Sequence, residues 1–247
     1  MLNSKKESKR KKFLEAKWQN LCLFTYAVEA ELLKPYLPAG LVSDSLNTEA
    51  EFAGKAFLSL VAFDFLDTAV FGVKWPGFIN FPEINLRFYV KDKNDRGVVF
   101  IRELVPQFLV AKLARFFYNE PYLSCPMKSS FSKTAGIIEI EHQIHFNNKT
   151  HALKLRAEET PYYPAENGIE NFFKEHRFGF GKSRNGKPLR YEVEHPLWEL
   201  YPVLSYELNF DFGAVYADEF AFLNQEKPFS VMLARGSKVC VFGKEEN

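Results

Sequence analysis

Three polar side chains occupy alternate positions in one strongly apolar stretch of the sequence. Residues 81–90 read Phe-Pro-Glu-Ile-Asn-Leu-Arg-Phe-Tyr-Val, which places Glu83, Asn85 and Arg87 between apolar residues. In a β-strand, alternate side chains point to the same face about 6.5–7 Å apart, so one small ligand can contact all three. A guanidinium clamps carboxylates and a carboxylate can act as a base. The stretch therefore predicts a strand with one core face and one polar, ligand-binding face.

The same polar row has a second interpretation. It also fits the solvated face of a two-layer sheet, or a structural ion pair between Glu83 and Arg87. The ligand-binding interpretation is favoured by the rarity of Asn in strands and by the fork geometry of Arg. The sequence leaves both interpretations open.

Composition narrows the classes of function. The net charge is +1 and no apolar run approaches the ~18 residues of a membrane helix, which predicts neither a nucleic-acid partner nor a membrane partner. The three cysteines, Cys22, Cys125 and Cys240, lack CxxC spacing and predict reduced thiols in a cytoplasmic protein. The sequence contains no Gly-rich phosphate loop, no HExxH and no GxSxG, so we expect no cofactor and no metal.

The remaining pattern predicts one domain that is rich in strands. Lysines and arginines cluster in residues 1–12, which we expect to be a disordered basic tail, and residues 13–247 form the single domain. The high aromatic content of 16% favours strands. Short helices are expected at 11–19, 29–36, 107–119 and 169–174, and strands at 21–28, 54–67, 81–90, 98–105, 137–146, 151–157, 177–184, 187–195, 203–210 and 231–242. This order predicts a largely antiparallel α+β fold.

Several short motifs follow one another in a fixed order along the chain. They are Trp18, Leu37-Pro38-Ala39-Gly40-Leu41 with Asp44, Glu83-x-Asn85-x-Arg87-x-Tyr89-Val90, Gly97-Val98-Val99-Phe100, Pro121-Tyr122, Glu175-x-Arg177 and His195-Pro196-Leu197-Trp198. The ordered set, over about residues 15–215, resembles the bacterial DUF2071 family of YqjF-like proteins. That family is regarded as related to acetoacetate decarboxylase, so the resemblance implies curved, cone-like antiparallel sheets that enclose a pocket, with few helices.

The resemblance does not carry over the decarboxylase chemistry. Acetoacetate decarboxylase uses a lysine, next to a second lysine in a Pro-Lys-Lys motif, to form a Schiff base with a keto acid. At the corresponding place this chain has Pro121-Tyr122-Leu123, so the Schiff-base lysine is absent there. Lys112 and Lys128 lie nearby in sequence, but neither has a neighbouring cation within two residues.

We therefore expect a small-molecule-binding protein whose ligand is a carboxylate or a carbonyl compound. Arg87, Glu83 and His195 are the candidate catalytic residues, acting as an anion clamp, a base and a proton carrier. The candidate ligand-binding residues are Asn85, Arg102, Tyr122, His142 and Trp198. A lone histidine on an apolar face is also compatible with a hydrogen-bonded core residue, for both His142 and His195. The sequence leaves open an enzyme of the lyase, decarboxylase or hydrolase type, a non-catalytic sensor, and a homo-oligomer.

Overall fold

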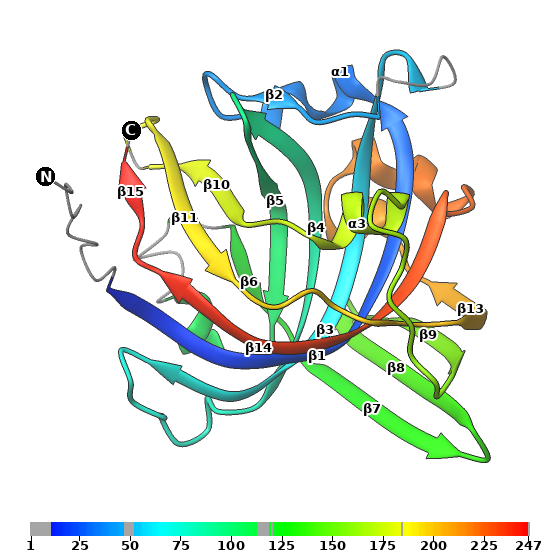
Figure 1. Ribbon diagram of the computed structural model, residues 1–247. Helices are drawn as coiled ribbons and strands as arrows, with labels where there is room; N and C mark the ends of the chain where they lie inside the picture. The colour runs from blue at the N-terminus through cyan, green and yellow to red at the C-terminus, as the bar shows by residue number, and fades with distance from the viewer. Residues whose placement is uncertain (1–10, 47–51, 113–118, 120, 184, 247) are drawn as a thin grey trace, which may run out of the picture.

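A computed structural model describes residues 11–46, 52–112, 119, 121–183 and 185–246. Two sheets dominate this part of the chain (Figure 1). Sheet A follows the order β12 (Leu200–Tyr201), β14 (Ser230–Phe242), β1 (Lys12–Glu29), β3 (Lys55–Val70), β4 (Phe81–Asp92), β5 (Asp95–Val105), β10 (Phe178–Lys182), β11 (Pro188–Glu194) and β15 (Glu245–Glu246). β2 (Val42–Ser43) pairs with β4, and β6 (Tyr122–Ser124) pairs with β5.

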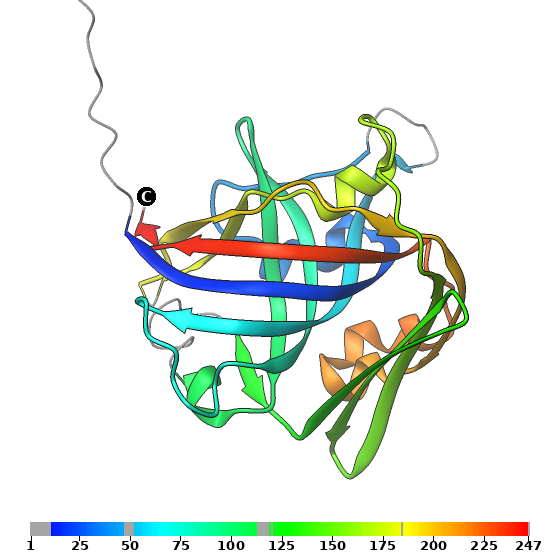
Figure 2. The ribbon, with the colours of Figure 1, turned by 60° about the horizontal axis from the view of Figure 1, so that its bottom comes forward.

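Sheet A curves until it nearly closes on itself. β14 pairs with β1 along most of its length and also with β11, through Val193 opposite Val241 and Glu194 opposite Cys240. The strand path therefore returns to its starting point and gives sheet A a ring-like form (Figures 1 and 2). Most pairings are antiparallel, whereas β5 is parallel to both β10 and β6. The predicted α+β fold with curved, mostly antiparallel sheets is confirmed.

Sheet B is a smaller antiparallel sheet beside the ring. Its order is β13 (Val203–Asn209), β9 (Lys149–Glu158), β8 (Ile137–Phe146) and β7 (Met127–Thr134). The helices are short: α1 (Ala30–Leu33), η1 (Lys34–Tyr36), α3 (Ile169–Lys174), α4 (Phe212–Val215), η3 (Asp218–Asn224) and the helical residues 108–112. None of the helices in the described part of the chain has the length and apolar character needed to span a lipid bilayer.

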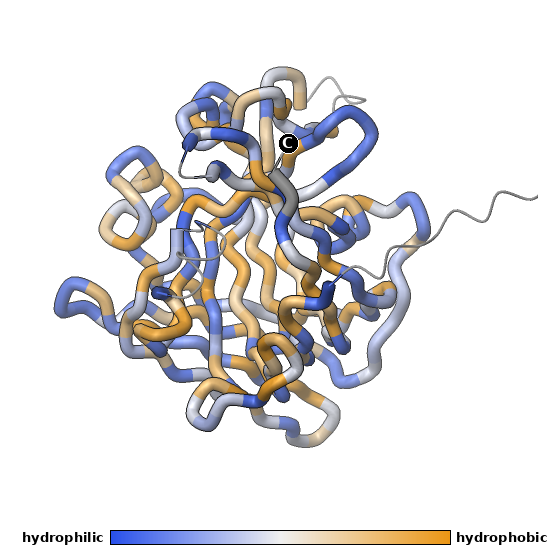
Figure 3. The backbone as a smooth tube through the Cα atoms, turned by 90° about the vertical axis from the view of Figure 1, so that its left-hand side faces the viewer, coloured by the Kyte–Doolittle hydropathy of each residue, from blue (hydrophilic) through white to orange (hydrophobic). Residues whose placement is uncertain are grey.

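Buried apolar side chains form two clusters, one on each face of sheet A. The outer cluster joins sheet A to sheet B, α4 and η3, through residues such as Leu86, Leu155 and Phe212. The inner cluster lines the concave face together with α3, through residues such as Phe57 and Phe173. Figure 3 shows hydrophobic strand segments in the middle of the molecule and hydrophilic residues in the turns at its edge. A strand of sheet A therefore has both faces covered.

β4 has the alternation that the sequence predicts. Its even residues, such as Leu86 and Phe88, belong to the outer cluster, and its odd residues point to the concave side. The predicted hairpin with β5 is also present, since Tyr89 lies opposite Val98 and Asp92 opposite Asp95. The register shifts once, between Leu86 and Arg87. β4 thus carries the core on one side and the polar row on the other.

The expected helix at residues 11–19 is wrong, because this segment is the first half of β1. β1 pairs with β14 on one side and β3 on the other, so its backbone hydrogen bonds are made between strands. The register against β3 shifts between Glu15 and Lys17 and again between Gln19 and Cys22, which interrupts the alternation that would have indicated a strand. Of the predicted basic tail, residues 1–10 lie outside the described residues, whereas Lys12 pairs with Phe242.

The amphipathic helix expected at 107–119 is only partly within the described residues. Residues 108–112 are helical, and residues 113–118 lie outside the described part. β14 runs without a break through Arg235 and Gly236, and its register against β1 does not shift there. Gly236 has φ +76°, and a Cβ atom there would lie 2.1 Å from the carbonyl oxygen of Trp18, so only glycine fits.

Candidate functional site

The concave face of sheet A encloses a cavity of about 580 Å³. This volume lies within the range of roughly 300–1,000 Å³ that is common for small-molecule sites. Much of the wall is aromatic and comes from strands all around the ring, including Trp18, Phe63, Phe65, Phe100, Phe178 and Trp198. The ring pairs are close, with centroids 5.2 Å apart for Trp18 and Phe63 and 6.1 Å apart for Trp18 and Trp198. The cavity therefore offers an apolar environment with few polar atoms.

The polar row of β4 lies on the wall of this cavity. Glu83, Asn85 and Arg87 all line it, and they are 2%, 1% and 8% exposed. They point inward because the even residues of the same strand are packed in the outer cluster. Arg87 forms no salt bridge with any described residue, so the structure contains no ion pair between Glu83 and Arg87. Of the arrangements that the sequence left open, the structure has the cavity-lining one.

Glu83 forms a hydrogen-bonded cluster with two of the predicted residues. Asn85 donates from Nδ2 to Oε1 at 3.0 Å, and the Tyr122 hydroxyl donates to Oε2 at 3.0 Å. Burial raises the pKa of Glu83 to about 7, although these hydrogen bonds act in the opposite direction. Burial also raises the pKa of Tyr122 well above its ordinary value, so its hydroxyl stays a donor. Glu83 can therefore gain or lose a proton near neutral pH.

A second carboxyl group, Glu103, lies beside this cluster. It is on β5 directly opposite Asn85, is 3% exposed and lines the cavity. From the sequence, Arg102 is a candidate ligand-binding residue, whereas Glu103 is not. Neighbouring residues of a strand point to opposite faces, so only one of the two can face the cavity. The structure gives that place to Glu103.

Arg87 is a buried cation that has no anionic partner among the described residues. Its single hydrogen bond runs from Nη2 to the carbonyl oxygen of Phe173 at 3.4 Å, and Nε has no partner among the described residues. The same carbonyl accepts a hydrogen bond from the Tyr89 hydroxyl at 3.3 Å, which holds the end of α3 against β4. A buried charge without a partner is costly, and an anion bound in the cavity would offset that cost.

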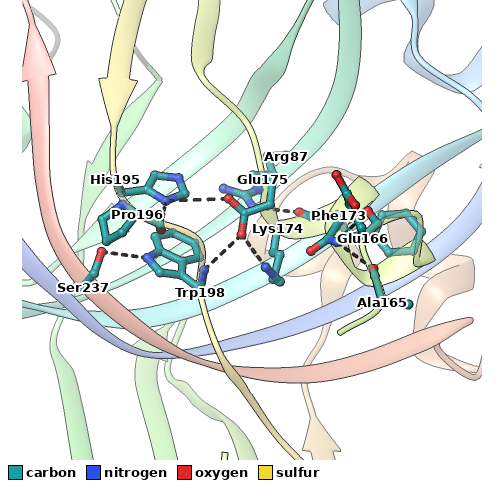
Figure 4. Close-up of polar contacts among 11 residues, drawn as sticks. Arg87, Ala165, Glu166, Phe173, Lys174, Glu175, His195, Pro196, Trp198 and Ser237 are labelled. Atoms are coloured by element: carbon teal, nitrogen blue, oxygen red, sulfur yellow. Dashed lines mark hydrogen bonds and ion pairs between the residues drawn. The ribbon is translucent and has the colours of Figure 1, made fainter. Parts of the chain in front are cut away.

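The end of α3 adds polar residues that were not among the candidate site residues (Figure 4). Lys174 is 2% exposed, lines the cavity and donates a hydrogen bond to Glu175. Glu175 also accepts from the backbone N–H of Trp198 at 3.2 Å and lies 3.9 Å from Nδ1 of His195. Glu175 thus connects α3 to the segment 195–198. A lysine at the end of a short helix normally extends into solvent, so its type and position gave no signal of this role.

His195 and Trp198 lie together on the cavity wall, as shown in Figure 4. Their rings stack with centroids 4.0 Å apart, and Trp198 donates from Nε1 to Ser237 at 2.8 Å. His195 Nδ1 lies 2.9 Å from the carbonyl oxygen of Pro196, so this nitrogen carries the proton and Nε2 is the free acceptor. Burial lowers the pKa of His195, which favours the neutral ring.

His176 is a further cavity residue outside the predicted set. It is buried beside Tyr89, with ring centroids 4.8 Å apart. Burial and the nearby guanidinium groups of Arg87 and Arg96 lower its pKa well below the ordinary value, so it adds no charge at neutral pH. Arg87 and Lys174 are the cations that line this part of the cavity, and Glu175 lies beside Lys174.

Two of the predicted ligand-binding residues lie elsewhere. Arg102 points to the outer side of sheet A, where it donates a hydrogen bond to the carbonyl oxygen of Val215 in α4. His142 is buried in the outer cluster region on β8, and neither ring nitrogen has a partner among the described residues. Neither residue lines the cavity, because Arg102 points to the outer face of sheet A and His142 belongs to sheet B. Lys112 and Lys128 are exposed and do not line it.

The sequence and the fold can both be compared with known proteins. The DUF2071 family, described as an uncharacterized conserved protein, matches residues 15–238. The uncharacterized protein YqjF of Bacillus subtilis strain 168 is 30% identical over 113 residues, which is 45% of this chain and less than half (44%) of that relative.

Similar solved structures come from acetoacetate decarboxylase-like enzymes. The enduracididine biosynthesis enzyme MppR has a TM-score of 0.65 at 12% identity, over 95% of this chain and 87% of that one. Acetoacetate decarboxylase from Legionella pneumophila has the same score and the same coverages at 11% identity. At such identities the likeness concerns the fold alone. Because the family match covers most of the sequence, the chain belongs to the DUF2071 family.

Proposed function

We propose that the protein binds a small organic carboxylate inside the cavity of sheet A. The observation that carries the proposal is Arg87, a buried guanidinium on the cavity wall. In the part of the chain that the structure describes, it has no carboxylate partner and its Nε is unpaired. A bound carboxylate would supply the missing charge and accept from Nε. Lys174 lies at the same end of the cavity and adds a second cation, which is balanced by Glu175.

The structural neighbours are compatible with this class of ligand. MppR has been solved in complex with pyruvate, which is a keto acid. The acetoacetate decarboxylases act on a keto acid by name. In this chain, Asn85 offers an unpaired Oδ1 acceptor beside Glu83, which suits a donor group on the ligand. Tyr122 occupies a place where the resemblance implies a lysine, so an imine at that position is not part of the proposal.

Acid–base catalysis is the second candidate function, and Glu83 favours it over passive sensing. A carboxyl group with a pKa of about 7 can both accept and donate a proton at neutral pH. It is held in place by Asn85 and Tyr122, which fix both oxygens. Neutral His195 would be a second proton acceptor through Nε2.

A thermal-shift screen of short carboxylates, keto acids and sugars tests the binding proposal. We expect carboxylates to raise the melting temperature of the wild type but not that of Arg87→Gln. Arg102→Gln is the matched control, because it removes a guanidinium from the adjacent strand on the outer side of the sheet. Its ligand-induced shift, measured from its own melting temperature, should equal that of the wild type. Equal shifts in Arg87→Gln would contradict the proposal.

The catalytic candidate needs a separate measurement on ligands found in that screen. We expect Glu83→Gln to keep binding and to lose turnover by at least about 100-fold, the usual contribution of a general acid or base. His195→Ala should reduce turnover less if Glu83 is the principal group. A ligand that binds but is recovered unchanged after incubation with the wild type would identify a sensor.

A further inference from the structure

The cavity opens to solvent through an apolar rim. Its most exposed lining residues are Phe71, Trp75 and Leu109, at 51%, 57% and 53%. The first two belong to the loop between β3 and β4, and Leu109 belongs to the helical residues 108–112. Gln107 donates from Nε2 to the carbonyl oxygen of Gly77 at 3.5 Å, which places the two segments side by side. Exposed aromatic groups gathered at one opening are unusual on a soluble surface and mark a binding site.

The rim and Arg87 are well separated along β4. The rim loop runs directly into Phe81, the first residue of β4, and Arg87 comes six residues later. At about 3.3 Å per residue the two positions are roughly 20 Å apart. The wall between them contains stacked rings, with Phe65 and Phe81 at 4.7 Å and 17° between planes. A two- or three-carbon acid held at Arg87 would leave most of this wall uncovered.

The polar groups on this path do not prevent an apolar body from passing. Asn85 and Tyr122 both donate to Glu83, so both Glu83 oxygens have partners within the protein, and Asn85 Oδ1 is the atom of this group left without a partner among the described residues. At the other end, Arg87 and Lys174 are two buried cations with one carboxylate, Glu175, between them. One end of the cavity therefore favours a negative charge, whereas the remainder favours apolar surface.

We infer that the ligand is an amphipathic carboxylate with an extended apolar body, whose acid group lies at Arg87 and Lys174 and whose body reaches toward the rim at Phe71, Trp75 and Leu109. This inference rests on the proposed carboxylate binding and adds the length and polarity of the ligand. In this arrangement the side chains of the rim cover the far end of the apolar body. A small ligand held at Arg87 would not reach them.

Binding of straight-chain carboxylates from acetate to dodecanoate, measured by titration calorimetry on the full chain, tests the inference. We expect Kd to fall by about four-fold per added methylene until the chain reaches the rim. An alcohol of the same length should bind more weakly than the acid. This comparison tests the acid group without any substitution, so it does not depend on how well Arg87→Gln folds.

Two adjacent residues provide the matched variants. Leu109→Ser should weaken dodecanoate several-fold and leave short acids unchanged, whereas Phe108→Ser should change neither, because Phe108 is 66% exposed and does not line the cavity. If short acids bind through Arg87 with no gain from chain length, the inference is overturned and the proposed function stands. If acids of every length fail to bind, both are overturned. Equal binding of acid and alcohol would also overturn both.

Discussion

The two faces of β4 are buried to the same degree but by different means. Leu86, on the outer face, is 0% exposed and packs in the cluster that joins the two sheets. Its neighbour Asn85, on the inner face, is 1% exposed and lines a cavity. The outer face packs directly against other side chains. The inner face borders the cavity and is shielded from solvent by the opposite side of the ring-like sheet. Burial alone therefore does not distinguish core residues from candidate site residues. Unpaired polar atoms that border the cavity distinguish them.

The same difference separates Arg87 on β4 from Arg102 on β5. Arg102 on the outer side is satisfied by a backbone carbonyl of α4, so its partner is part of the fold. Arg87 on the inner side retains an unpaired Nε. A buried arginine that is hydrogen-bonded within the protein stabilises the folded state. A buried arginine without a partner lowers the stability of the folded state, and binding of an anion would offset this loss. The following predictions test this distinction, from the largest expected effect to the smallest.

The largest difference in the free energy of unfolding is expected between substitutions of two adjacent residues on β4. Leu86→Ala should lower the free energy of unfolding by about 2–5 kcal/mol, because it leaves a cavity in the packed cluster. Arg87→Gln should change it by less than about 1 kcal/mol, because an unpaired buried charge is removed. Urea denaturation followed by circular dichroism measures both. A loss in Arg87→Gln as large as that in Leu86→Ala would make Arg87 a structural residue.

Glu175→Gln is expected to have the next largest effect. It leaves the Lys174 ammonium buried without a carboxylate, which should cost roughly 2–4 kcal/mol. Adding Lys174→Met to this variant should recover most of the loss, because the unpaired charge is then removed. The double-mutant cycle is measured by urea denaturation. If the double variant is no more stable than Glu175→Gln, the loss of stability does not come from the ion pair between Lys174 and Glu175.

Glu83 should make stability depend on pH in a direction opposite to that of a paired carboxylate. The unfolded side chain loses its proton near 4.5, while the folded one keeps it to about 7. The unfolded state therefore binds fewer protons between these values, and the free energy of unfolding falls as pH rises through this window. Over the whole window the free energy of unfolding should fall by on the order of 3 kcal/mol.

Glu83→Gln should remove this slope, measured by urea denaturation at pH values from 4 to 8. Glu207→Gln is the control, since Glu207 is exposed on β13 of sheet B. A slope that persists unchanged in Glu83→Gln would assign the dependence to another group.

The smallest change in stability is expected for a substitution on the outer side of sheet A. His142 is buried on β8, and burial lowers the pKa of its ring, so it is a neutral polar group without hydrogen-bond partners among the described residues. His142→Phe should be neutral or stabilising by about 1 kcal/mol and should leave ligand binding unchanged. Thermal denaturation and the carboxylate screen check the two parts. Loss of binding in this variant would mean that the outer side also contributes to the site.

The sequence predicted the structure best in the segment where one face of a strand is fully apolar. The alternation in residues 81–90 gave both the strand and the inward direction of Glu83, Asn85 and Arg87. His195 and Trp198 were found through their combination of residue types beside a proline. These features are local, so the sequence alone contains them.

The remaining features depend on the tertiary structure. The strand at residues 12–19 was missed because bulges break its alternation while two neighbouring strands satisfy its backbone. The choice of Arg102 over Glu103 failed because the register shift after Leu86 is not visible in the sequence. Lys174 was missed because its burial arises from the packing of α3 against β4, through Tyr89 and Phe173.

The closing contact of the ring has a consequence for synthesis. β14 supplies Val241 to the cavity wall and joins β1 to β11, yet it follows all the other strands of the ring in the sequence. The earlier strands can pair as hairpins on the ribosome, but a ring without β14 has an open side and no enclosed volume. Its pairing with β1 spans almost the whole described chain, which makes it a slow, long-range step. The cavity is therefore enclosed only after β14 has been synthesised and has paired with both β1 and β11, so a probe of the enclosed volume would report on closure of the ring.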